Sequence, residues 1–185
     1  MKELSLNILD VTKNSVTAGA DTVKIFLLTS SDGWLEFRVE DNGCGMSEEV
    51  QRRVTDPFYT TRTTRKVGMG LPLLKLAAEQ TGGRLKIVSS TEKGKSGTTI
   101  SATFDTNSID FMPVGDIVST VCILISGSPE VRFVFEDTNP TGTVSIDTSD
   151  LREVLGDDIS LAEPEIVMWM RDYLKEQYAE RTKSV

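Results

Sequence analysis

The segment DNGCGM, residues 41–46, places a carboxylate just before two glycines that stand two residues apart. A carboxylate accepts hydrogen bonds, and a backbone without side chains at Gly43 and Gly45 could lie close against a large flat ligand. The same glycines could instead form a simple turn. Asp41 and its neighbours leave both interpretations open, so the surrounding elements have to decide between them.

A second group of polar residues lies in the opening segment, residues 2–18, which the spacing of its apolar residues predicts to be a helix. At about 100° per residue, Glu3, Asn7, Asp10 and Asn14 fall within about 60° of one another on the helix surface. This stripe could be an edge exposed to solvent. It could also line a ligand site, where an asparagine oxygen and a carboxylate hold a divalent cation and orient water.

The chain of 185 residues contains no histidine. A Ser-His-Asp triad, a histidine-ligated zinc site and a histidine phosphorylated within this chain are therefore excluded. Its two cysteines do not form a CxxC motif, so no disulfide framework is indicated. The sequence shows no signal-peptide pattern and no apolar run long enough to span a bilayer, so we expect a cytoplasmic protein without a membrane segment.

The acidic side chains are concentrated in the second part of the sequence. Residues 106–185 hold 15 of the 28 acidic side chains and 6 of the 20 basic ones. Such a surface repels phosphates, so we expect no direct binding to nucleic acid. The acidic surface could simply be solvated, or it could be a docking face for a basic partner.

The predicted secondary structure places residues 41–46 directly after a strand and the polar stripe along the first helix. Strands are predicted at residues 22–29, 34–40, 84–90, 98–104, 131–136 and 143–147. Helices are predicted at residues 2–18, 48–54, 71–80, 115–126, 150–155 and 164–180. The character of the chain changes near residues 106–110, which predicts one domain at residues 1–106 and a C-terminal α+β extension of unknown role at residues 107–185.

Five short motifs follow one another along the first part of the chain: LDVTKNSVTAGA, DNGCGM, DPFYTTR, VGMGLPLLKLAAEQTGG and GTT at residues 97–99. In this order they resemble the motifs of the histidine-kinase-like (GHKL) ATPases, which include DNA gyrase, Hsp90, MutL and sensor kinases. One such motif is common by chance, whereas five in family order are specific. The resemblance covers about residues 1–105. It implies the Bergerat ATP-binding fold, an α/β (α+β) two-layer sandwich with helices on one face of a mixed sheet.

The resemblance also implies a binding site for ATP and Mg²⁺. Asp41 would accept a hydrogen bond from the exocyclic amine of adenine, which favours ATP or ADP over GTP. Thr98 would help to hold Asp41 and the base, and Met46 would offer a soft apolar surface near the ring. Asn14 would bind the Mg²⁺ that bridges the phosphate oxygens. The other nucleotide-binding residues that the resemblance implies are Gly43, Gly45, Arg65, Lys66, Gly68, Gly70 and Leu71.

Asp10 departs from the pattern of the ATP-hydrolysing members, which have a glutamate four residues before the magnesium-binding asparagine as general base. Aspartate is one methylene shorter, which shortens its reach by about 1.5 Å. A general base must come within about 3 Å of the proton that it takes, or act through one water. We therefore treat Asp10 as a candidate catalytic base and a candidate metal ligand, and we expect no fast intrinsic hydrolysis.

Two functions agree with these expectations. The first is a Mg²⁺-dependent, ATP-binding kinase that transfers a phosphoryl group to a separate partner protein, in the manner of sensor kinases or of the anti-sigma factor kinases, which phosphorylate serine. The second is a nucleotide-gated interaction module or slow ATPase, in which ATP closes a lid and changes the affinity for a partner. The sequence does not identify the partner or the phospho-acceptor.

Overall fold

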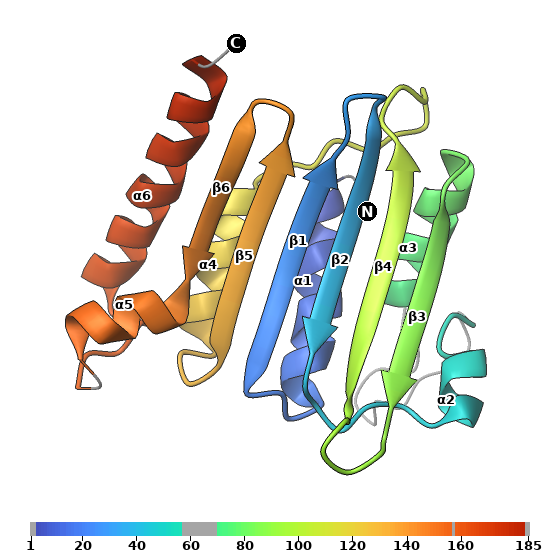
Figure 1. The fold of residues 1–185 in the computed structure, drawn as a ribbon, viewed down its shortest axis with the longest axis horizontal. Helices are drawn as coiled ribbons and strands as arrows, with labels where there is room; N and C mark the ends of the chain where they lie inside the picture. The colour runs from blue at the N-terminus through green and yellow to red at the C-terminus, as the bar shows by residue number, and fades with distance from the viewer. Residues whose placement is uncertain (1–2, 57–69, 157, 184–185) are drawn as a thin grey trace.

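The computed structural model describes residues 3–56, 70–156 and 158–183. In these residues, six strands form one mixed sheet in the order β3-β4-β2-β1-β5-β6 (Figure 1). The strands are β1 (Thr22–Thr29), β2 (Trp34–Asp41), β3 (Arg84–Ser90), β4 (Gly97–Asp105), β5 (Arg132–Asn139) and β6 (Gly142–Asp147). The helices are α1 (Leu4–Thr17), α2 (Glu48–Arg53), α3 (Gly70–Gln80), α4 (Ile117–Gly127), α5 (Thr148–Leu155) and α6 (Pro164–Lys183).

Alternation of apolar and polar residues along the strands gives the sheet one buried face. In β2, Leu35, Phe37 and Val39 are at most 2% exposed, and the residues between them are more exposed. The helices α1, α3 and α4 cover this face, while no helix of the described ranges covers the opposite face (Figure 1). The predicted α/β architecture, with helices on one face of a mixed sheet, is confirmed.

Helix α1 occupies the middle of the helical layer, where it packs between α3 and α4. The first backbone N–H groups of a helix have no partner within the helix. Here the N–H groups of Leu4 and Ser5 donate to the carbonyl oxygens of Pro113 and Val114, at 2.9 and 2.8 Å. The segment between β4 and α4 therefore caps the helix that carries the polar stripe.

The residues after position 106 continue the same sheet. β5 pairs in parallel with β1, with a register that runs from Thr22 opposite Arg132 to Leu28 opposite Thr138. β6 then pairs antiparallel with β5. The division of the chain into two domains at residue 106 remains a prediction, and the two parts share one sheet and one helical layer.

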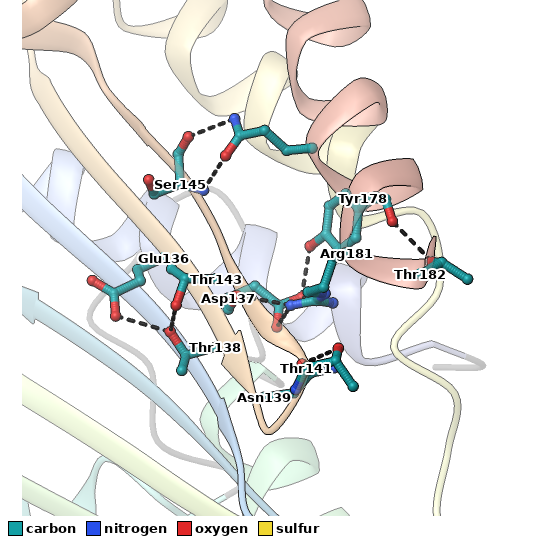
Figure 2. A network of polar contacts seen from close by, with 11 residues as sticks. Glu136, Asp137, Thr138, Asn139, Thr141, Thr143, Ser145, Tyr178, Arg181 and Thr182 are labelled. Carbon is teal, nitrogen blue, oxygen red and sulfur yellow. Dashed lines mark hydrogen bonds and ion pairs between the residues drawn. The ribbon is translucent and has the colours of Figure 1, made fainter. Parts of the chain in front are cut away.

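Helix α6 lies along β6, and polar side-chain contacts connect it to the sheet (Figure 2). Asp137 of β5 accepts hydrogen bonds from Tyr178 Oη at 2.6 Å and from Arg181 Nη1 at 3.0 Å. The side-chain amide of Gln177 bonds the backbone N–H and carbonyl of Ser145, at 3.0 and 2.9 Å. Because β6 is the last strand of the sheet, Gln177 occupies backbone groups that another strand could otherwise pair with.

No helix within the described ranges combines the length and the apolar character that crossing a membrane requires.

Candidate functional site

Three polar side chains form a row across one end of the sheet, where β2 and β3 end and β4 begins. Asp41 lies opposite Thr98, and Thr98 lies opposite Ser89. Side chains alternate between the faces of a strand, so these residues share the buried face with Val39 and Ile100. The row is therefore a polar strip on an otherwise apolar face, and Thr98 within it is only 8% exposed.

The Asp41 carboxylate is held by donors from three parts of the chain. Its Oδ2 accepts a hydrogen bond of 2.6 Å from Ser15 Oγ on α1. Its Oδ1 accepts from the backbone N–H groups of Gly43 at 3.0 Å and Thr98 at 3.2 Å. A carboxylate offers about four lone-pair sites. These contacts among the described residues leave one site on Oδ2 for a further donor, such as an amine.

The glycines of residues 41–46 allow the loop to fold tightly against α1 and β3. Gly45 has φ +71°, and a Cβ at this position would overlap the carbonyl oxygen of Ser90. A Cβ at Gly43 would lie 2.9 Å from the carbonyl oxygen of Ala18, which also accepts from the Cys44 N–H at 2.9 Å. Both glycines are thus required by close contacts with the protein's own backbone. Their approach to a ligand remains a proposal.

Ser89 connects this loop to the two strands beside it. The Ser89 hydroxyl accepts a hydrogen bond of 2.7 Å from the Met46 N–H and lies 2.9 Å from the Gly97 carbonyl oxygen and 2.8 Å from Thr98 Oγ1. Gln51 of α2 adds bonds to the carbonyl oxygens of Met46 and Ser89, at 2.9 and 3.0 Å. The backbone of Met46 is therefore fixed on both sides.

The polar stripe of α1 is more buried than a solvated helix edge. Asn7 is fully buried, and its Oδ1 has no partner among the described residues, while its Nδ2 donates to Met112 Sδ at 3.5 Å. Asp10 and Asn14, which follow on the same side of the helix, are half-buried. A Cβ at Gly70 would lie 3.4 Å from the Asp10 Cβ. The structure thus brings the Asp10 carboxylate against the first residue of α3.

Two of the remaining predicted residues, Gly70 and Leu71, begin α3. Leu71 is 6% exposed, so its side chain belongs to the core and only its backbone could face a phosphate. Arg65, Lys66 and Gly68 lie outside the residues that the structure describes. Within those residues, no three or more Asp, Glu, Cys or His side chains cluster as a metal site. Asp10 and Asn14 could supply two oxygen ligands, which Mg²⁺ commonly combines with phosphate oxygens and water.

The part of the chain that carries these residues matches a known protein family. A family model described as "Histidine kinase-, DNA gyrase B-, and HSP90-like ATPase" matches residues 1–108. The chain belongs to this ATPase family. Its family region carries Asp41, Thr98 and the helix with Asp10 and Asn14, and residues 109–185 lie beyond the match.

Curated relatives of this chain include two bacterial kinases. The signal transduction histidine-protein kinase AtoS of Escherichia coli is 30% identical over 89 residues, which are 48% of this chain and 14% of AtoS. The adaptive-response sensory kinase SasA of Prochlorococcus marinus is 32% identical over 98 residues, or 51% of this chain and 26% of SasA. The chain thus matches less than a third of the length of either relative.

Solved structures with the same fold cover more of the chain than these relatives do. The match with the N-terminal domain of a DNA repair protein covers 85% of this chain and 58% of the other protein's chain, with a TM-score of 0.59 and 14% identity. The MutL ATPase domain of Aquifex aeolicus, complexed with ADP, covers 83% of this chain and 67% of its own, with a TM-score of 0.54 and 16% identity. This likeness concerns the fold, and it confirms the predicted α/β ATPase architecture.

Sequence reasoning did not identify Ser15 and Ser89 as part of the site. Ser15 follows Asn14 directly and is 3% exposed, and Ser89 continues the inward-facing positions of Leu85 and Ile87 in β3. The sequence signal that could have identified both residues is a hydroxyl at a core-facing position, because buried polar groups need hydrogen-bond partners.

Proposed function

We propose that the chain binds ATP together with Mg²⁺, recognises adenine through Asp41 and passes the γ-phosphoryl group to a separate protein. The observation that carries this proposal is the Asp41 carboxylate, which Ser15, Gly43 and Thr98 hold in place while one acceptor site of Oδ2 stays open. A fixed and partly buried acceptor favours an amine and penalises a carbonyl oxygen at the same position. Membership of the ATPase family supports ATP as the ligand.

The residues near the start of α3 suit the phosphate end of such a ligand. Asp10 and Asn14 provide the carboxylate and amide oxygens that Mg²⁺ accepts as ligands, with phosphate oxygens and water completing the coordination. Mg²⁺ would neutralise charge on the phosphates. The α3 N-terminus at Gly70 could add backbone N–H groups, which favour anions. The residues present therefore fit a metal–nucleotide complex.

The phosphoryl acceptor is assigned to another protein because this chain has no histidine, and because two of its relatives are named histidine or sensory kinases. In the transfer, the bond between the γ-phosphorus and the β–γ bridging oxygen breaks, and ADP keeps the electron pair. A bond forms from the γ-phosphorus to a nitrogen or oxygen of the partner. The proton of the acceptor would pass to solvent or to Asp10, which lies against Gly70 at the start of α3.

A second candidate is a nucleotide-gated interaction module, and the position of α1 favours it. α1 carries Asp10 and Asn14, and it packs against α4, which belongs to the C-terminal part of the chain. A shift of α1 on nucleotide binding would therefore reach the surface formed by residues 107–185. In this case ATP would change the affinity for a partner without phosphoryl transfer.

Binding is tested by calorimetric titration of the whole chain with ATP and GTP, with and without Mg²⁺. We expect ATP to bind more tightly than GTP, and Asp41→Asn to weaken ATP binding by at least about tenfold, because an amide nitrogen would face donors that need an acceptor. Asp105→Asn is the matched control, since Asp105 ends β4 at the opposite end of the sheet and accepts from the Asn107 N–H. Equal binding by the unaltered chain and Asp41→Asn would contradict the proposal.

The two candidate functions are separated by labelled ATP and candidate partner proteins. Transfer of label from the γ-phosphate to a partner supports the kinase. Partner capture that requires a non-hydrolysable ATP analogue, with no transfer of label, supports the gated module. Asp10→Glu tests the reach of the proposed base, and we expect slow hydrolysis to rise when the longer side chain restores that reach.

A further inference from the structure

The hydroxyl of Ser89 lies at the centre of a small hydrogen-bond network beside Asp41. The Met46 N–H, at 2.7 Å, can only donate, so Ser89 Oγ accepts from it. The Gly97 carbonyl oxygen, at 2.9 Å, can only accept, so the Ser89 hydroxyl donates its hydrogen bond to it. The single proton of Ser89 is thereby assigned.

The third neighbour of Ser89 is Thr98 Oγ1, at 2.8 Å, where geometry alone allows either oxygen to be the donor. If Ser89 donated to Thr98, its own oxygen and that of Gly97 would face each other at 2.9 Å without a proton between them. Two oxygen lone pairs at this distance repel. The arrangement that satisfies every contact therefore has Thr98 donating to Ser89.

We propose that Ser89 is a positioning residue that determines specificity. It accepts a hydrogen bond from the Thr98 hydroxyl, so that Thr98 can offer a ligand only lone pairs. This inference rests on the proposed function, in which Asp41 and Thr98 hold the base. Asp41 is also an acceptor, and Thr98 supplies its backbone N–H to Asp41 Oδ1 at 3.2 Å. The side-chain oxygens at this edge of the site then all require donors from the ligand.

The amine at position 6 of adenine supplies such donors, whereas a 6-oxo purine presents an oxygen that meets only lone pairs. If Ser89 is replaced by alanine, the Thr98 hydroxyl loses its acceptor and becomes free to rotate. It can then donate to a 6-oxo group or to a water bound there. Removing Ser89 should therefore weaken the discrimination between the two purines, in addition to any general loss of affinity.

The test measures dissociation constants for ATP and ITP on the unaltered chain and on Ser89→Ala. The two bases differ in the group at position 6 and in N1, which is an acceptor in adenine and an N–H donor in hypoxanthine. We expect the ratio of the ITP constant to the ATP constant to fall about five- to tenfold in Ser89→Ala. Ser89→Cys keeps the shape and bonds weakly, so it should lower the ratio in the same direction. Ser90→Ala is the matched control, because the Ser90 hydroxyl accepts from the Glu92 N–H in the adjoining turn and should leave the ratio unchanged.

A purely structural role of Ser89 would weaken both ligands equally and leave the ratio of constants unaltered. Thr98→Val separates the two routes, because it removes the hydroxyl through which Ser89 is proposed to act. In the Thr98→Val background, Ser89→Ala should no longer change the ratio.

An unchanged ratio in Ser89→Ala and Ser89→Cys, with ATP still bound by the unaltered chain, would overturn this inference alone. A fall in the ratio that persists in the Thr98→Val background would also overturn it. Failure of the unaltered chain to bind ATP at all would instead overturn the proposed function, and this inference with it. Both ligands are titrated into the same protein sample, so partial unfolding of a variant cancels in the ratio.

Discussion

Ser15 Oγ donates a hydrogen bond of 2.6 Å to Asp41 Oδ2 and so joins α1 to the end of β2. Ser15 directly follows Asn14 and is 3% exposed. The helix that carries the proposed metal ligands Asp10 and Asn14 therefore also fixes the carboxylate that is proposed to recognise the base. Through this bond, a displacement of α1 at the proposed phosphate end of the site would move the Asp41 carboxylate at the proposed adenine end.

Removal of the Ser15 hydroxyl should loosen the Asp41 carboxylate. We expect Ser15→Ala to weaken ATP binding about three- to tenfold, because one lost hydrogen bond to a charged group is worth about 1.5–3 kcal/mol and part of this is recovered by water. Ser5→Ala is the matched control on the same helix, since Ser5 is 1% exposed and its hydroxyl bonds only Glu3 Oε2, at 3.4 Å, in the described contacts. Calorimetry that gives equal ATP affinities for both variants would contradict the role of Ser15.

The glycines with positive φ allow backbone strain to be separated from steric overlap. Gly94 has φ +82° with no heavy atom within 4 Å of an added Cβ, whereas an added Cβ at Gly45, with φ +71°, would overlap the Ser90 carbonyl oxygen. Gly94→Ala should cost about 1–2 kcal/mol of unfolding free energy from backbone conformation alone. Gly45→Ala should cost about 1–3 kcal/mol more, because the loop must also move away from β3. Urea unfolding measures both costs, and equal costs would mean that the contact with Ser90 is not required.

The elements of the fold could be predicted because their signals are local. Strands were predicted at residues 22–29 and 34–40, and the structure has both, with one residue more, Asp41, in the second. The order of the strands could not be predicted in this way. β5 pairs with β1 across more than a hundred residues of chain, and such pairing depends on how α4 packs against α1 rather than on either strand alone.

The same limit applies to the candidate site. Asp41 and Thr98 were identified through motifs, each of which is a contiguous stretch of sequence. The roles of Ser15 and Ser89 arise only when α1, β3 and β4 come together, because a hydroxyl has no signature until the register sets its neighbours. Sequence spacing placed Asn7 on the polar stripe with Asp10, but the burial of Asn7 beside Met112 became visible only in the folded chain.

The attachment of α6 to the sheet depends on a buried charge. Asp137 is 9% exposed and is neutralised by Arg181, with Tyr178 as a second donor (Figure 2). Arg181→Met should lower the unfolding free energy by about 3–5 kcal/mol, because it leaves a buried carboxylate without its cation. Tyr178→Phe should cost less, about 1–2 kcal/mol, since the ion pair remains. Arg171→Met, on the exposed side of the same helix, is the control. A cost for Arg181→Met no larger than that of the control would contradict this role of the Arg181 cation.

Burial is the main cause that raises the pKa of Tyr178 well above the usual value of a tyrosine, and the nearby Asp137 carboxylate raises it further. Tyr178 therefore keeps its proton, and its hydrogen bond to Asp137, at neutral and mildly alkaline pH.

The pair of Arg132 and Asp147 should make stability depend on pH at the acidic end. Arg132 donates to both oxygens of Asp147, at 3.1 and 2.7 Å. These bonds, helped by the Ser149 N–H, lower the pKa of Asp147 to about 2 from an ordinary 3.8. Because the pKa is lower in the folded chain than in the unfolded one, the stabilisation is complete above about pH 4 and is lost as the pH falls toward 2.

Asp147→Asn isolates this contribution, since the amide can still cap α5 but carries no charge. Arg132 is half exposed, so solvent screens the pair, and we expect the variant to be about 1–2 kcal/mol less stable at pH 7. The difference between variant and unaltered chain should shrink in unfolding experiments as the pH falls from about 4 to 2.5, because protonation of Asp147 removes the same charge. Asp110→Asn, an exposed aspartate between β4 and α4, should show no such trend. A difference that stays constant over this range would mean that packing or capping by Asp147, rather than its charge, stabilises the junction of β6 and α5.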